Sequence, residues 1–92
     1  MFRSEADILM EAPARCLLRL CRHWSHKFQV ELNETQGRID FCPAGCELLV
    51  IEGGLRVRVQ TPDEGELDQL LEVVAEHLRR MAGNDLRIDW QR

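Results

Sequence analysis

The sequence contains no tyrosine and, among its 92 residues, only one lysine, Lys27. It also lacks any apolar run close to the roughly 20 residues that a helix needs to cross a bilayer. Its first residues do not show the basic and then apolar pattern of a secretory signal. We therefore expect a cytoplasmic protein without a membrane segment, whose four cysteines are mostly reduced thiols.

Several well-known catalytic motifs are also missing. The sequence has no phosphate-binding loop, no nucleophile elbow and no paired-histidine protease motif. Its net charge of −4 argues against a general nucleic-acid binder, since such proteins are usually basic. A chain of 92 residues without repeats or linkers is expected to form one domain, residues 1–92, with little room for a deep pocket.

The charges are unevenly distributed along the chain. Between residues 60 and 76 there are six acidic residues and no basic one. Between residues 12 and 30 there is no acidic residue, and the basic ones are Arg15, Arg19, Arg22 and Lys27. The sequence therefore predicts one cationic helix and a second helix whose first half is anionic.

Apolar residues recur with the two periods that distinguish strands from helices. Alternation predicts strands at residues 2–10, 28–33, 38–41, 46–52, 55–60 and 86–90. Helical spacing predicts a first helix that begins at Pro13 and includes Trp24. It predicts a second helix that begins at a capping box, with Thr61 as its N-cap, and ends before Gly83.

The order of these elements is β-α-β-β-β-β-α-β. Two helices and a sheet with a largely charged outer face predict an α+β fold, namely a two-layer sandwich with both helices on one face of a mainly antiparallel sheet. Residues 33–37 are expected to form a turn in which Gly37 takes positive φ.

The strand at residues 46–52 is apolar on both of its faces. Leu48 and Val50 share one face, and Leu49 and Ile51 share the other. Such a strand is central and covered, or its outer face meets a partner. A homodimer through Leu49 and Ile51 is the simplest partner, and the alternative is that a loop or a chain terminus covers them.

Four short motifs stand out along the chain: Leu20-Cys21-x-His23-x-x-His26-Lys27, Gly37-Arg38-Ile39-Asp40-Phe41, His77-Leu78-x-Arg80 and Asp89-Trp90. Together they resemble a bacterial family, the domain of unknown function 2218. The resemblance covers nearly the whole chain. It implies a connection with bacterial iron handling, because genes of this family often accompany iron-siderophore uptake genes, and some members carry an aldolase label.

The three histidines are the candidate metal ligands. His23 and His26 are three residues apart, so both imidazoles can reach one metal ion such as Fe or Zn, and His77 can add a third ligand if its helix comes near. The alternative for His23 and His26 is that they complement the helix dipole and bond the open carbonyls of the last turn. The alternative for His77, which borders an apolar stripe, is a core role.

Cationic and thiol side chains supply two further candidate sites. Arg19, Arg22 and Lys27 can bind an anionic ligand or an acidic protein, or they form a solvated surface. Cys42 and Cys46 flank a Pro-Ala-Gly turn and form a candidate redox pair. The alternative is that Cys46 is buried, because it continues the inward register of the strand that follows.

Three hypotheses about function follow. The first is a small non-enzymatic binding or accessory protein in iron or siderophore handling, with a metal or an anionic metal complex near His23 and His26. The second is a protein interaction module without a metal, with a basic docking helix and a homodimer through the outer strand. The third is a lyase of the aldolase type with Lys27 or His77 as its acid–base group, although nothing in the sequence supplies a pocket for Lys27.

Overall fold

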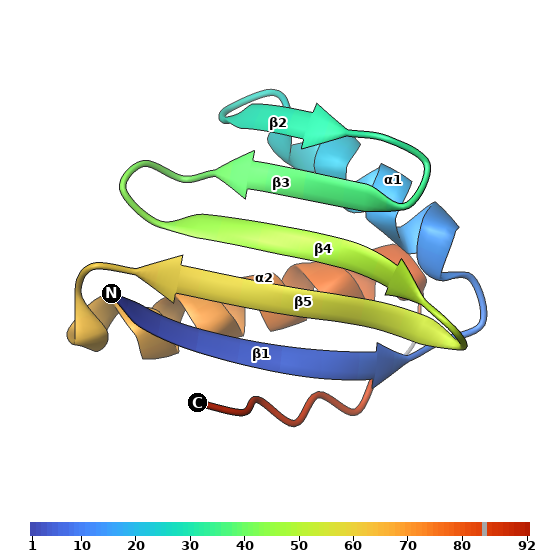
Figure 1. The fold of residues 1–92 in the computed structure, drawn as a ribbon. Helices are drawn as coiled ribbons and strands as arrows, with labels where there is room; N and C mark the ends of the chain where they lie inside the picture. The colour runs from blue at the N-terminus through green and yellow to red at the C-terminus, as the bar shows by residue number, and fades with distance from the viewer. Residues whose placement is uncertain (84) are drawn as a thin grey trace.

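The computed structural model describes residues 1–83 and 85–92. Over these residues the elements are β1 (Phe2–Leu9), α1 (Pro13–Trp24), β2 (Gln29–Leu32), β3 (Gln36–Asp40), β4 (Gly45–Ile51), β5 (Gly54–Thr61) and α2 (Glu64–Ala82). The strands form one antiparallel sheet in the order β1-β5-β4-β3-β2, and both helices lie behind it (Figure 1). The predicted α+β two-layer sandwich is confirmed.

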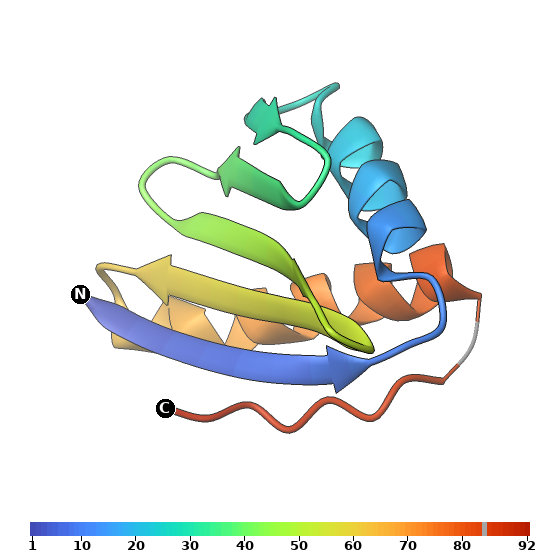
Figure 2. The ribbon, with the colours of Figure 1, turned by 45° about the vertical axis from the view of Figure 1, so that its right-hand side comes forward.

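The two helices share the inner face of the sheet between them. α1 packs on β2, β3, β4 and β5, whereas α2 packs on β5 and β1 (Figure 2). Ile8, Leu20, Val57 and Leu78 lie between the layers and are 0% exposed. Burial of each such side chain stabilises the fold by about 1.5–3 kcal/mol. Neither of the two described helices is long and apolar enough to cross a membrane.

A glycine of β3 faces α1 directly. A Cβ atom on Gly37 would lie 2.6 Å from Cys21 Sγ and 2.8 Å from Leu17 Cδ1, so only a residue without a side chain fits there. The prediction that Gly37 takes positive φ in a turn is wrong, because Gly37 belongs to β3. The turn precedes it, and Asn33 Oδ1 closes the turn by accepting the N–H groups of Thr35 and Gln36.

α2 begins two residues later than the capping box predicts. Thr61 is still the last residue of β5, where it is buried and pairs with Phe2. The N-cap is Asp63, whose Oδ1 accepts the N–H of Gly65 at 2.9 Å. The helix ends at Ala82, and Gly83 follows as its C-cap with φ 77°, as predicted.

The predicted last strand, residues 86–90, is not a strand in the structure. The C-terminal segment runs beside β1 (Figure 1), and its only backbone pairing with β1 among the described residues is a bridge between Glu5 and Gln91, with N···O distances of 2.8 and 2.7 Å. Ser4 Oγ also donates to the Gln91 carbonyl at 3.2 Å, and side chains of α2 hold the rest of the segment. Arg79 Nε donates to the Leu86 carbonyl at 3.1 Å, and Asp68 pairs with Arg92.

The substitution Gly37→Ala tests the close approach of α1 to β3. The added methyl group meets Cys21 and Leu17, so we expect a loss of about 1–3 kcal/mol in the free energy of unfolding. Urea denaturation followed by tryptophan fluorescence measures this loss. Gly45→Ala is the matched control, because the nearest described neighbour of its Cβ position is 3.6 Å away. Equal stability of the two variants would contradict the packing described.

Candidate functional site

α1 crosses α2 near the C-terminal part of α2. At this crossing Arg19 Nη1 donates a hydrogen bond to the Met81 carbonyl at 3.2 Å, and Cys16 Sγ lies 4.0 Å from the Leu78 carbonyl. The last carbonyls of a helix lack partners within the helix, so Arg19 satisfies one of them. The predicted anion-binding residue Arg19 therefore joins the two helices.

The crossing brings His77 to the first of the two α1-region histidines. The ring centroids of His23 and His77 are 5.1 Å apart, and that of Trp24 is 4.8 Å from His77 with planes inclined by 31°. His77 is half-buried and His23 is exposed. We call His23 and His77 the histidine pair. Sequence alone did not show whether these two residues meet, and the structure shows that they do.

A backbone carbonyl fixes the orientation of the His77 ring. Its Nδ1 lies 2.7 Å from the carbonyl oxygen of Val73, one turn earlier in α2. A carbonyl oxygen only accepts hydrogen bonds, so Nδ1 is the donor. In neutral His77 the lone pair then lies on Nε2. This is the arrangement that orients metal-binding histidines in proteins, whose second nitrogen bonds a carbonyl or a carboxylate.

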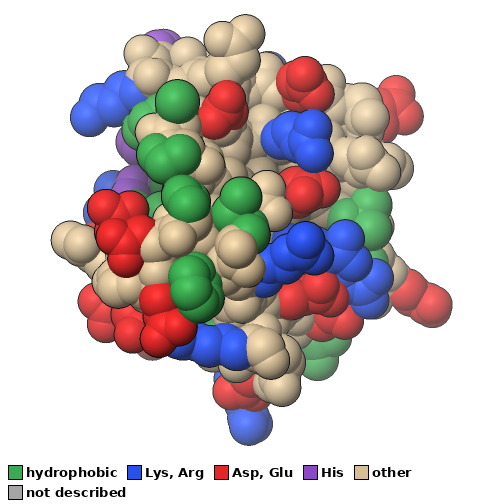
Figure 3. Space-filling model, turned by 60° about the vertical axis from the view of Figure 1, so that its left-hand side comes forward, with side chains coloured by type: hydrophobic (Ala, Val, Ile, Leu, Met, Phe, Trp, Pro, Cys, Tyr) green, Lys and Arg blue, Asp and Glu red, His purple; other side chains and the backbone are tan. Residues whose placement is uncertain are grey.

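Aromatic side chains form the floor beside the histidine pair. Trp24 is only 5% exposed and meets Phe41 edge to face, with centroids 5.0 Å apart. Phe28 also packs edge to face on Phe41, with ring centroids 4.8 Å apart. In the space-filling view the histidines border a band of hydrophobic side chains (Figure 3). The cluster makes the histidine pair one side of a packed, half-apolar surface.

His26 stands apart from the histidine pair. It is exposed in the turn after α1, and no ring contact joins it to His23 or His77 among the described residues. Over residues 1–83 and 85–92, no three histidine, cysteine or acidic side chains gather as a metal ion requires. Two of the predicted ligands therefore meet, and the third does not join them.

The carbonyls at the end of α1 have partners other than histidine. Backbone N–H groups of residues 25, 27 and 28 donate to the carbonyls of Cys21 and Trp24, and Ser25 Oγ donates to the Arg22 carbonyl at 2.8 Å. In the alternative interpretation, His23 and His26 bonded the open carbonyls of this last turn. The carbonyls of Cys21, Arg22 and Trp24 accept from these other donors instead. Arg22 and Lys27 are both exposed beside this turn.

All four cysteines are free thiols in very different surroundings. Cys46 is 1% exposed, and burial raises its pKa strongly. Burial also raises the pKa of Cys21 to about 11. Cys42, in contrast, is exposed in the loop between β3 and β4. The buried position that the sequence suggested for Cys46 is confirmed, and it shields this thiol from the oxidants that a redox pair requires.

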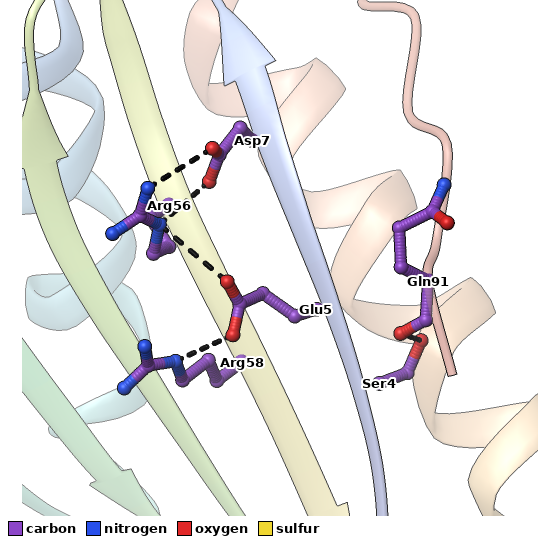
Figure 4. Close-up of polar contacts among 6 residues, drawn as sticks. All are labelled: Ser4, Glu5, Asp7, Arg56, Arg58 and Gln91. Atoms are coloured by element: carbon purple, nitrogen blue, oxygen red, sulfur yellow. Dashed lines mark hydrogen bonds and ion pairs between the residues drawn. The ribbon is translucent and has the colours of Figure 1, made fainter.

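Ion pairs on the outer face of the sheet were not predicted. Arg56 donates to both carboxylate oxygens of Asp7, at 2.8 and 3.1 Å, and Arg58 Nε donates to Glu5 at 2.7 Å (Figure 4). The hydrogen bond from Arg56 lowers the pKa of Asp7. The sequence shows alternating acids in one segment and alternating arginines in another. Their meeting depends on the pairing of β1 with β5, for which the sequence carries no signal.

Two comparisons with other proteins agree with this structure. A family described as an uncharacterized protein conserved in bacteria (DUF2218) matches residues 5–91. Among solved structures, the chain is similar to the NMR structure of PA4090 from Pseudomonas aeruginosa, with 46% sequence identity, a TM-score of 0.84, and coverage of 99% of this chain and 96% of that one. No curated protein matches the sequence.

Thiol labelling under native conditions tests the surroundings of the cysteines. At pH 8 we expect Cys42 to react rapidly with a disulfide reagent, whereas Cys21, with a pKa of about 11, stays protonated and buried. In denaturant all four cysteines should react. The absence of a rapid native thiol, with only two thiols in denaturant, would instead indicate a Cys42–Cys46 disulfide. Cys42→Ser identifies the rapid site.

Proposed function

This chain belongs to the bacterial DUF2218 family, and we propose that it is a non-enzymatic binding protein that holds a transition-metal ion between His23 and His77. The observation that carries the proposal is the hydrogen bond from His77 Nδ1 to the Val73 carbonyl. It leaves Nε2 as the coordinating atom of a ring 5.1 Å from the ring of His23. Imidazole nitrogens suit iron, zinc, copper and nickel.

Two imidazoles leave at least half of a metal ion's coordination positions open. A tetrahedral ion needs two more ligands, and an octahedral ion needs four. The described residues supply no third ligand in reach. We therefore propose that the metal arrives with its own ligands, as a chelate. An iron chelate agrees with the connection to iron handling that the family resemblance implies.

Exposed cations that neighbour His23 in the sequence suit the anionic groups of such a chelate. Lys27 follows His23 by four residues, and Arg22 precedes it directly. Arg19 is less available, since it already donates to the Met81 carbonyl. The same exposure of Lys27 disfavours the aldolase hypothesis, because a Schiff-base lysine is commonly activated by desolvation in a hydrophobic pocket.

Isothermal titration of the purified chain with Zn²⁺ tests the histidine pair. We expect saturable binding near one ion per chain, and His23→Ala or His77→Ala should each weaken it by on the order of 100-fold, at least as much as the loss of a residue that supports a ligand. His26→Ala is the matched control and should leave the affinity unchanged. Loss of binding in His26→Ala alone would refute the pair as the site.

The second candidate function is a homodimer through the outer face of β4. The register places Ile51 opposite Gly54 and Gly54 opposite Leu9, so two apolar side chains flank a residue without one. Leu9 is 78% exposed, and Leu49 lies two residues from Ile51 on the same face. We propose that a second copy covers this apolar corner, while the basic face of α1 (Arg15, Arg19 and Arg22) docks an acidic protein.

Light scattering after size exclusion tests the dimer. If the apolar corner is the interface, Ile51→Lys should shift the protein to the monomer mass, because a buried charge without a partner opposes association. Leu18→Lys is the matched control, since Leu18 is 37% exposed but lies on α1. A wild-type protein that stays monomeric at millimolar concentration would rule the dimer out.

A further inference from the structure

A groove of about 430 Å³ lies on the outer face of the sheet, on the side opposite the helices. Three arginines line it, together with two glutamates and one outward-facing leucine: Arg38, Arg56, Arg58, Glu31, Glu47 and Leu49. The strand register places five charged residues in one row across the sheet, with alternating sign: Glu31, Arg38, Glu47, Arg58 and Glu5. We call this site the arginine groove.

Carboxylates of β1 hold two of the arginines from one side. Asp7 accepts hydrogen bonds from Nε and Nη2 of Arg56. Glu5 accepts one from Nε of Arg58, and its carboxylate also lies 3.5 Å from Nε of Arg56. In Figure 4 the other guanidinium nitrogens point away from β1, toward β4. Glu5 and Asp7 are thus positioning residues, and they leave donors directed over the groove.

The third arginine approaches from the other side of β4. The side chain of Arg38 is 62% exposed, and Arg38 Nη2 lies 3.9 Å from Glu47, too far for a hydrogen bond. Glu47 is the cross-strand neighbour of both Arg38 and Arg58. It is therefore a negative charge near the centre of the groove. Leu49 adds apolar surface to the same groove.

We propose that the arginine groove binds an organic anion. Its carboxylate or phosphate group would lie between Arg38, Arg56 and Arg58, and its apolar part would lie on Leu49. A guanidinium presents a planar fork of donors that matches both kinds of oxyanion. Pairing with β1 fixes two of these forks before a ligand arrives, which lowers the entropic cost of binding.

NMR titration of the ¹⁵N-labelled chain tests the site with three probes: hexyl phosphate, hexanoate and inorganic phosphate. We expect saturable shifts of β3, β4 and β5 amides for at least one of the six-carbon anions, and weaker binding of inorganic phosphate, which lacks the apolar part. The first two probes distinguish a phosphate ester from a carboxylate. If neither six-carbon anion gives saturable shifts in these strands, the proposal is wrong.

Substitutions in the groove separate a site from general charge attraction. Arg58→Gln and Arg38→Gln should each weaken binding about tenfold, by loss of a charged donor. Glu47→Gln should strengthen it about threefold, because it removes a nearby negative charge. Arg3→Gln is the matched control, since Arg3 lies on β1 outside the groove. If Arg3→Gln weakens binding as much as Arg38→Gln, the attraction is unspecific and the proposal fails.

Arg38→Gln keeps the test valid if Arg58→Gln fails to fold. Arg58 is bonded to Glu5, so Arg58→Gln can disturb the pairing of β1 with β5. Among the residues that the structure describes, the Arg38 side chain makes only the 3.9 Å contact with Glu47, so its substitution should leave the fold unchanged. A folded Arg38→Gln variant with wild-type affinity for the six-carbon anion would overturn the proposal. The arginine groove and the histidine pair lie on different layers, so each test stands without the other.

Discussion

The position of α1 between β3 and α2 is the constraint on which the rest of the structure depends. On one side, Gly37 removes the side chain that would collide with Leu17 and Cys21. On the other side, Arg19 bonds the Met81 carbonyl at the end of α2. With both contacts made, the last turn of α1 places Trp24 and His23 beside the part of α2 that carries His77. The histidine pair is thus a consequence of how the helices pack.

The two faces of the sheet carry different kinds of side chain. The inner face is apolar and lies under both helices. The outer face carries acids and arginines that alternate across the strands. Exposed ion pairs of this kind contribute little to stability, about 0–1 kcal/mol each. Their more informative property is geometric, because the carboxylates of β1 hold Arg56 and Arg58 in fixed orientations beside an open groove.

Much of the fold could be predicted from the sequence, because burial imposes a period on each element. The stripe of Leu17, Leu20 and Trp24 and the alternation in residues 55–60 both mark buried faces that the structure confirms. The sequence predictions are wrong at positions where tertiary contacts determine the local structure. Gly37 does not form a turn but leaves room for α1 to pack against β3. Asp63 caps α2 because Thr61 remains in β5. Likewise, three histidines could be named as candidates, but which of them meet depends on the crossing of α1 and α2.

The central claim is that the Val73 carbonyl fixes the His77 ring with its Nε2 lone pair available beside His23. Long-range ¹H–¹⁵N NMR of the imidazole rings tests this claim most directly, because it reports the tautomer of each histidine. We expect neutral His77 as the Nδ1–H tautomer, and Zn²⁺ should shift the resonances of both rings of the pair while those of His26 stay in place. Neutral His77 as the Nε2–H tautomer, or a Zn²⁺ response confined to His26, would contradict the account.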